Sequence, residues 1–475
     1  MSQPPPKDNV QEPAQSSQMT GAVNHLSLEG MHGSVDVPPA RASFWRQWRA
    51  FSGPAVLVSV GYMDPGNWGT DLAGGAQFQY GLLWVVGLAS LMAIFMQVMS
   101  TRLGVVTGKD LAQCCRDWYP RWTRAPNWLF CEMAIGACDL AEVLGSAVAL
   151  NLLFHIPLLW AVLITGLDVL LLLGLQGLGM RKIEAVVLLL VATIAGCYFI
   201  EIFVLPQTQP SFLQMGRALA HPNLHQAGMM YVAIGIIGAT VMPHNLYLHS
   251  ALVQSRRLQK DEASVRSAIR FNTIDSVTAL AIAFLVNASI LVLAAMVFYG
   301  KTSITVAGGQ VVAFRPDSDW IRIAYLTLAP LLGASVASTL FAVALLASGQ
   351  SSTITGTLAG QVVMEGFMHW RIQPWLRRLI TRTLAILPAV LIIGIRGDSS
   401  VNDLLTLSQV VLALQLPFAM FPLLQFTCSR QRMGAWRNGW FLMSAGWGSA
   451  LLITAMDIWG LSDSLKSAWH VIVGN

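Results

Sequence analysis

The chain has 475 residues, of which 55% are hydrophobic and only 11% are charged, and its formal net charge is +5. Soluble proteins carry about 25% charged residues, so this composition excludes an ordinary soluble domain and indicates a polytopic membrane protein. The mean hydropathy of +0.57 agrees with this class. The small net charge gives no reason to expect a nucleic-acid partner, and the expected partner is a lipid bilayer.

Residues 1–43 are rich in Pro, Gln, Ser and Gly, and they lack the apolar core of a signal peptide. We therefore expect a disordered cytoplasmic tail. The six cysteines of the chain fall in predicted spans or cytoplasmic loops, so a disulfide framework is not expected.

The remaining chain alternates apolar segments of spanning length with short loops. We predict eleven spans, near residues 52–74, 79–103, 127–155, 157–178, 183–204, 228–253, 273–299, 321–348, 379–396, 403–427 and 438–459. Arg and Lys gather in every second loop, which places the N-terminus in the cytoplasm and residues 461–475 outside as a tail. Segment 351–370 mixes polar with apolar residues and predicts a short amphipathic helix on the cytoplasmic face.

The first span is interrupted by the sequence Asp64-Pro-Gly-Asn67. Pro65 lacks a backbone N–H and Gly66 allows unusual backbone angles, so the helix should break here. A break frees carbonyl groups in the membrane interior, where a bound cation would satisfy them. Asp64 supplies a negative charge and Asn67 a neutral oxygen. The alternative is a proline kink with Asp64 paired to a Lys or Arg.

Three acidic residues share one predicted face of the third span: Glu132, Asp139 and Glu142. Intramembrane carboxylates in a row are typical of proton or ion routes. The alternative is pairing with a basic residue of another span, for which Arg382 in the ninth span is the obvious candidate. Both interpretations can hold together.

The sixth span is interrupted at Pro243, with Gly235 and Gly238 just before it. Two broken spans, five spans apart, predict an inverted-repeat transporter with its site at the membrane midplane. The Ala239 carbonyl and the Met242 thioether lie beside this second break. Sulfur favours Mn²⁺, Fe²⁺ or Cd²⁺ over Mg²⁺ and Ca²⁺, although Met242 could also be ordinary packing.

Two further polar residues each allow two interpretations. His244 could carry protons, because a histidine titrates near neutral pH, or it could be a satisfied interior histidine. Gln409 in the tenth span could reach a metal ion or could bond a neighbouring helix.

The two interrupted motifs resemble the paired signatures of the Nramp divalent-metal transporters. Residues 100–112, 139–145 and 347–361 also resemble motifs of that family, in the same order. The resemblance covers residues 44–460 and is strongest to bacterial manganese-transporting members.

This resemblance implies an all-α, LeuT-like fold with two inverted five-helix repeats, about 50–204 and 226–427, and an extra span at 438–459. It implies a monomeric transporter, not an enzyme, in the cell (inner) membrane, without a cofactor, which imports Mn²⁺ or Fe²⁺, and also Cd²⁺, with protons. The implied metal ligands are Asp64, Asn67, Ala239, Met242 and Gln409. The implied proton route comprises Glu132, Asp139, Glu142, His244 and Arg382. The alternative function is a sodium-coupled carrier of small solutes on the same fold, against which the soft ligand argues.

Overall fold

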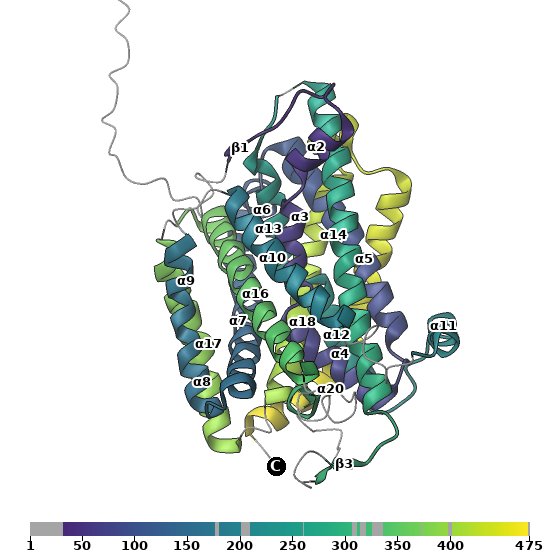
Figure 1. Cartoon of the computed structure of the whole chain (residues 1–475). Coiled ribbons are helices and arrows are strands. Elements are labelled where there is room, and N and C mark those ends of the chain that lie inside the picture. The colour runs from purple at the N-terminus through teal and green to yellow at the C-terminus, as the bar shows by residue number, and fades with distance from the viewer. Residues whose placement is uncertain are drawn as a thin grey trace, which may run out of the picture.

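The computed structural model describes residues 32–175, 180–200, 210–259, 261–305, 311–313, 320–324, 336–370, 372–397 and 401–473. Helices make up almost all of this part of the chain (Figure 1). In the described residues, eight helices are long and apolar enough to cross a membrane. The elements, in chain order, are β1 (Val35–Asp36), α2 (Phe44–Phe51), α3 (Pro54–Gly61), α4 (Pro65–Phe78), α5 (Leu83–Thr107), α6 (Leu111–Trp118), α7 (Arg124–Phe154), α8 (Leu158–Ile164), α9 (Asp168–Leu175), α10 (Met180–Phe199), α11 (Phe212–Ala220), α12 (Met229–Val241), α13 (Pro243–Leu252), β2 (Arg256–Arg257), α14 (Glu262–Val297), β3 (Ser303–Thr305), β4 (Val311–Ala313), α16 (Val336–Met368), α17 (Pro374–Arg396), α18 (Val401–Cys428), α19 (Arg430–Met433) and α20 (Trp440–Val473).

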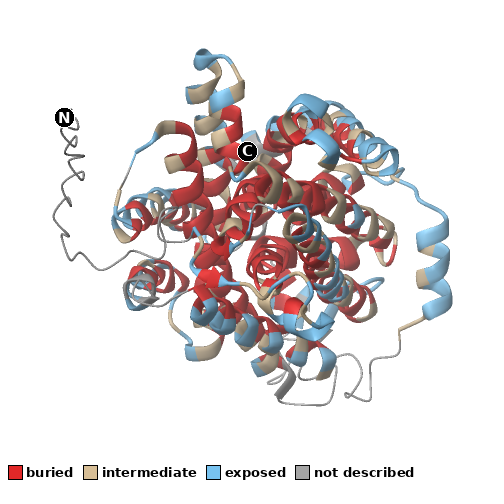
Figure 2. Ribbon diagram, turned by 90° about the horizontal axis from the view of Figure 1, so that it is seen from above, coloured by how far each residue is buried: buried red, intermediate tan, exposed pale blue. Residues whose placement is uncertain are grey.

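The breaks in the first and sixth predicted spans are confirmed. The first span consists of α3 and α4, and the sixth consists of α12 and α13; a proline opens the second half-helix of each. The fourth predicted span is also interrupted, by a short 3₁₀ turn at Thr165–Leu167 between α8 and α9. The half-helices α4 and α12 pack against each other and against α18, and α7 packs against α16 and α18. In the view from above, buried ribbons gather at the centre (Figure 2).

The prediction for segment 351–370 is wrong. Its residues continue the eighth span as the second half of α16, and most of them are buried. The hydroxyls do not need water because they bond carbonyls of their own helix: Thr353 Oγ1 donates to Gly349 O over 2.9 Å, and Thr357 Oγ1 donates to Thr353 O over 2.8 Å. The small residues let other helices approach closely: a Cβ added at Gly349 would lie 2.2 Å from Ser146 Oγ on α7.

The described residues that flank the predicted spans include two elements that the sequence analysis did not predict. Residues 32–43 of the expected tail are described, and residues 1–31 lie outside the described part. Val35–Asp36 pair in parallel with Arg256–Arg257, directly after the sixth span, which holds this segment in place. At the other end, α20 continues past the predicted span to Val473. Segment β1 and helix α2 lie at one end of the molecule and β3 lies at the opposite end (Figure 1).

Candidate functional site

The first break is organised by Asp64, which caps the N-terminus of α4. Its Oδ1 accepts hydrogen bonds from the backbone N–H of Asn67 (2.9 Å) and from Asn67 Nδ2 (2.8 Å). Asp64 is fully buried, and no Lys or Arg in the described chain forms an ion pair with it. The alternative of a proline kink with a paired aspartate is therefore not supported by the described residues.

Two carbonyls freed by the first break, those of Tyr62 and Met63, accept hydrogen bonds from side chains. Asn287 Nδ2 on α14 donates to Tyr62 O over 2.8 Å. Trp68 Nε1 donates to Met63 O over 3.2 Å, and the hydroxyl of Ser348 on α16 donates to the same oxygen. Because three different helices supply these donors, the break is fixed in position by the surrounding bundle.

The second break faces the first. Met242, which joins α12 to α13, has a φ of 40°, a strained conformation for a residue with a side chain. Its Sδ accepts a hydrogen bond from Asn245 Nδ2 over 3.3 Å. A Cβ added at Gly61 would lie 3.1 Å from Met242 Sδ and 2.3 Å from Asn245 Nδ2, so only glycine allows this approach of the two breaks.

Asn67 joins the two breaks through its amide nitrogen. Nδ2 points at three oxygen atoms, Gly61 O (3.3 Å), Asp64 Oδ1 (2.8 Å) and Ala239 O (3.2 Å). Its Oδ1 accepts a hydrogen bond from Asn287 Nδ2 over 3.2 Å. Oxygens from both breaks therefore converge on one point, which now holds the positive end of an amide dipole.

Gln409 lies beside the first break. A Cβ added at Gly66 would lie 1.9 Å from Gln409 Nε2 and 2.8 Å from its Oε1. Nε2 donates to Ser408 Oγ over 2.9 Å, whereas the buried Oε1 has no hydrogen-bond partner in the described chain. An acceptor oxygen without a donor among the described residues therefore lies beside Gly66 at the first break.

The predicted acidic residues of α7 all form ion pairs, but Arg382 is not the main partner. Arg378 bonds Asp139 and also bonds Glu142, over 2.8 Å. Glu132 pairs separately with Arg377 over 2.7 Å. Arg382 lies 3.7 Å from Glu142 Oε2, and it donates to the backbone oxygen of Asp139 over 3.4 Å. The expected pairing of the acidic row with Arg382 is therefore present at Glu142, whereas Arg378, one turn earlier on α17, bonds the Asp139 carboxylate.

Asp168 at the start of α9 joins this cluster, although sequence reasoning gave it no role. It accepts from Arg378 over 3.2 Å and from Arg382 over 2.5 Å. The acidic cluster, defined as Asp139, Glu142 and Asp168, thus shares two arginines, and all five side chains are buried. The available signal was the i, i+4 spacing of Arg378 and Arg382, which places both on one face of a helix.

Cys138 lies between the first break and the acidic cluster. Its Sγ is 3.9 Å from Asp64 Oδ2 and 3.8 Å from Glu142 Oε1. The sequence gave Cys138 no role beyond the cysteine count. His244 is buried at the start of α13, and its Nδ1 has no hydrogen-bond partner in the described chain. Of the residues predicted for the proton route, Asp139, Glu142 and Arg382 lie together, whereas His244 makes no hydrogen bond to them among the described residues.

A second histidine, His249, forms a hydrogen-bonded chain that sequence reasoning missed. Its Nδ1 lies 2.9 Å from Gln97 Oε1, and Gln97 Nε2 donates to Tyr62 Oη over 2.7 Å. Tyr62 Oη in turn reaches Val241 O, at the second break, over 3.4 Å. This chain crosses from α13 through α5 to α3. In the described residues, no three His, Cys, Asp or Glu side chains form a group suited to hold a metal ion.

Known proteins resemble this chain over nearly its whole length. Residues 55–463 match the family model Nramp, natural resistance-associated macrophage protein-like. The chain is 51% identical over 447 residues to the divalent metal cation transporter MntH of a Nostoc species, covering 94% of this chain and 98% of that one. It is 47% identical over 450 residues to MntH of Listeria innocua, covering 94% and 96%. A crystal structure of the Eremococcus coleocola manganese transporter, in complex with an aromatic bis-isothiourea substituted compound, superposes with a TM-score of 0.82 at 41% identity, covering 92% of this chain and 91% of that one. The expected LeuT-like fold is confirmed.

Proposed function

This chain belongs to the Nramp family, and from that premise we propose that it carries divalent metal cations, Mn²⁺ or Fe²⁺ and also Cd²⁺, into the cell together with protons. The relatives' names, divalent metal cation transporter and manganese transporter, support the substrate class. The observation that carries the proposal is the convergence of Gly61 O, Asp64 Oδ1 and Ala239 O on the Asn67 amide group. Three oxygens that surround a partial positive charge are also suited to a cation.

In this proposal, metal binding turns the Asn67 amide. The three oxygens now face its N–H₂ group, whereas a cation at that point requires an oxygen from Asn67. Rotation of the amide presents Oδ1 and removes the N–H₂ group. The Met242 thioether supplies a softer ligand, which favours Mn²⁺, Fe²⁺ and Cd²⁺ over Mg²⁺ and Ca²⁺. Gln409 Oε1, without a donor beside Gly66, is a further oxygen ligand in some conformations.

Proton coupling is supported by the charge balance of the acidic cluster. Three carboxylates share the two guanidinium groups of Arg378 and Arg382, so one negative charge remains when all are ionised. In a low-dielectric interior, an unbalanced charge is costly, and a bound proton removes it. Cys138 lies between this cluster and Asp64, so a proton displaced from Asp64 by an arriving cation has an acceptor nearby.

Alternating access follows from the two breaks, since half-helices can tilt while the other half stays in place. We further propose that the protein is a monomer in the cell membrane with a cytoplasmic N-terminus and an external C-terminus. A sodium-coupled carrier of organic solutes fits less well. Such carriers hold a substrate carboxylate at a free helix N-terminus, and here the N-terminus of α4 is already capped by the Asp64 carboxylate.

The test is Mn²⁺ binding and Mn²⁺ uptake by liposomes, with and without an imposed pH gradient, for the parent and for Asp64→Ala. We expect the variant to lose both binding and uptake. Asp71→Asn is a matched control for binding, because Asp71 is a buried acid of the same half-helix that lies away from the break. Normal Mn²⁺ affinity and uptake in Asp64→Ala would refute the proposal of a metal site at the membrane midplane.

A further inference from the structure

Helix α11 lies across the direction of the spans, at the edge of the bundle. In Figure 1 it is seen along its axis, while the spans run from top to bottom; from above it lies at the right-hand edge and is mostly exposed (Figure 2). Its first residue follows Ser211, whose hydroxyl accepts a hydrogen bond from the backbone N–H of Gln214 over 3.4 Å. None of its nine residues is buried. The axis of α11 is therefore parallel to the plane of a membrane that the spans cross.

Successive residues of an α-helix are turned by about 100°, which gives α11 three faces. Met215 and Ala218 form the first face and pack against the bundle. The second, which we call the apolar face, is exposed and consists of Phe212, Leu213, Gly216, Leu219 and Ala220. Gln214 and Arg217 form an exposed polar face on the other side of the bundle face. A helix with these three faces is suited to the place where protein, lipid and water meet.

The depth of α11 in the membrane follows from its contact with α5. A Cβ added at Gly87 would lie 3.9 Å from Leu219 Cδ2. The charged residue of α5 is Arg102, which donates to carbonyl groups of the loop before α20. From Leu83 to Arg102 the helix rises about 29 Å, which is close to the thickness of a hydrocarbon core, about 30 Å. Gly87 therefore lies about 6 Å inside one edge of the hydrocarbon. Interfacial helices bury their apolar side to a similar depth, about 5–10 Å.

We propose that α11 is an interfacial anchor, which lies in the headgroup region of the bilayer with its apolar face on the acyl chains. Phe212 and Leu213, which are 71% and 67% exposed, enter the hydrocarbon, and Arg217 faces the headgroups. The proposed topology assigns α11 to the external leaflet, because it follows the fifth span. The alternative occupant of the apolar face is a second copy of the chain. Nine residues of helix measure about 14 Å by 10 Å, far less than the area of about 800 Å² that each partner buries in a stable interface.

The anchor is connected to one half of each broken span. Gln79, directly after α4, donates from Nε2 to Gln214 Oε1 over 3.4 Å. On the other side, residues 221–228 connect α11 to the start of α12. In the proposed function, one half of a broken helix tilts while the other half stays in place. An anchor at the membrane surface holds α4 and α12 as the halves that stay. This consequence, unlike the lipid contact itself, rests on the proposed function.

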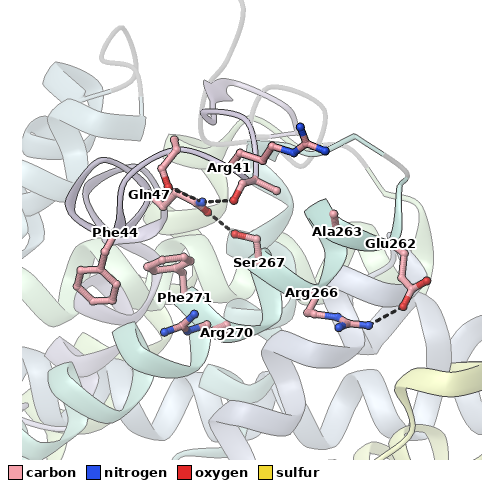
Figure 3. Close-up of a pocket in the computed structure, with 11 residues that line it drawn as sticks. Arg41, Phe44, Gln47, Glu262, Ala263, Arg266, Ser267, Arg270 and Phe271 are labelled. Atoms are coloured by element: carbon pink, nitrogen blue, oxygen red, sulfur yellow. Dashed lines mark hydrogen bonds and ion pairs between the residues drawn. The ribbon is translucent and has the colours of Figure 1, made fainter.

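The experiment uses the full chain in phosphatidylcholine nanodiscs, with a fluorophore on one introduced cysteine. Leu213→Cys reports from the apolar face, and Arg217→Cys on the polar face of the same helix is the matched control. Glu262→Cys is the aqueous reference, because Glu262 is exposed and pairs with Arg266 in the first turns of α14, at the end of the molecule that carries α2 (Figure 3). The quenchers are iodide in water and a phospholipid with a spin label near the glycerol end of its acyl chain. We expect the lipid to quench the Leu213 label and iodide to quench the other two labels. The parent chain, treated in the same way, measures labelling of the native cysteines.

A second set of variants tests whether the apolar face holds the helix. Phe212→Asp/Leu213→Asp should lift α11 from the lipid, so a label at Ala220→Cys should lose its quenching by the spin-labelled lipid. Arg217→Asp, on the polar face, should leave that quenching unchanged. Unchanged lipid quenching in the double variant would show that the apolar face does not hold α11 in the interface.

Two further results would overturn the inference. Iodide quenching of the Leu213 label as strong as that of the Glu262 label would place α11 in water. Protection of the Leu213 label from both quenchers would assign the apolar face to a protein partner, such as a second copy of the chain. Mn²⁺ uptake by liposomes is measured separately. Lipid quenching of the Leu213 label in a chain without Mn²⁺ uptake would support the anchor and refute only the proposed transport function.

Discussion

Gly145 lies where α7 meets the first break, and its replacement tests how the break is held in place. A Cβ added there would lie 2.1 Å from Pro65 Cβ and 2.4 Å from Pro65 Cγ. The proline ring has no rotamer that moves it away, and it opens α4, so relief requires a shift of one helix against the other. Gly136 on the same helix is the matched control, because a Cβ there meets nothing within 4 Å.

Two opposing effects set the expected magnitude. Alanine is favoured over glycine inside a helix by about 1 kcal/mol, and this gain applies to both variants, so it cancels in their comparison. Overpacking of a filled interior costs about 1–3 kcal/mol, and this loss applies to Gly145→Ala alone. We therefore expect the free energy of unfolding of the two variants to differ by about 1–3 kcal/mol, with Gly145→Ala the less stable.

The assay combines thermal unfolding of the purified variants with Mn²⁺ uptake into liposomes. Because a shift of α7 against α4 also displaces Asp64 from Cys138 and Glu142, Gly145→Ala should lose uptake as well as stability. Gly136→Ala should keep both. Equal stability and equal uptake in the two variants would refute the close contact between Gly145 and Pro65.

Three further predictions address selectivity, coupling and topology. Met242→Ala should impair the discrimination between Mn²⁺ and the ions Ca²⁺ and Mg²⁺ more than it impairs Mn²⁺ transport itself. Excess Ca²⁺ or Mg²⁺ should therefore inhibit uptake by the variant more than uptake by the parent. Unchanged exclusion of both ions would mean that the thioether only packs. Asp168→Asn leaves two carboxylates with two arginines in the acidic cluster, so Mn²⁺ uptake should become less dependent on pH while the fold is kept. The assay uses liposomes with two dyes that report Mn²⁺ and H⁺ entry. An unchanged proton-to-metal ratio would contradict the charge argument. Asn475→Cys should react with an impermeant thiol reagent outside intact cells, and labelling only after permeabilisation would mean that the span count is wrong by one.

The breaks could be predicted from the sequence because their causes are local. Pro65 and Pro243 cannot continue a helix, and Asp64 with Asn67 three residues later has the spacing of an N-cap interaction. The same local reasoning could not show that Asn287 and Ser348 satisfy the freed carbonyls. Those donors come from helices more than 200 residues away along the chain, and no spacing rule connects them to the break.

Other failures have the same origin. Segment 351–370 is polar by composition, but its hydroxyls bond their own helix, so it can be buried at little cost. Arg378 and Arg382 lie one helical turn apart on the same face, so the position of α17 along its axis decides which of them meets Asp139. Side-chain partners across helices depend on such positions, which hydrophobic patterns do not specify.

The residues of α7 that approach the first break lie on one face of that helix. Cys138, Glu142 and Gly145 are spaced at helical intervals of four and three residues, so all three point toward α4 and α16. The thiol at Cys138 has one hydrogen to donate and lies within 4 Å of two carboxylates, Asp64 and Glu142. It can donate to only one of them at a time. In the proposed function, a metal ion bound at Asp64 would remove that carboxylate as an acceptor and leave the thiol to Glu142. The contact of Gly145 with Pro65 holds α7 against α4, and so keeps Cys138 close to Asp64. Metal occupancy at the break would thereby be linked to the charge state of the acidic cluster through one helix face, without any large movement of the bundle.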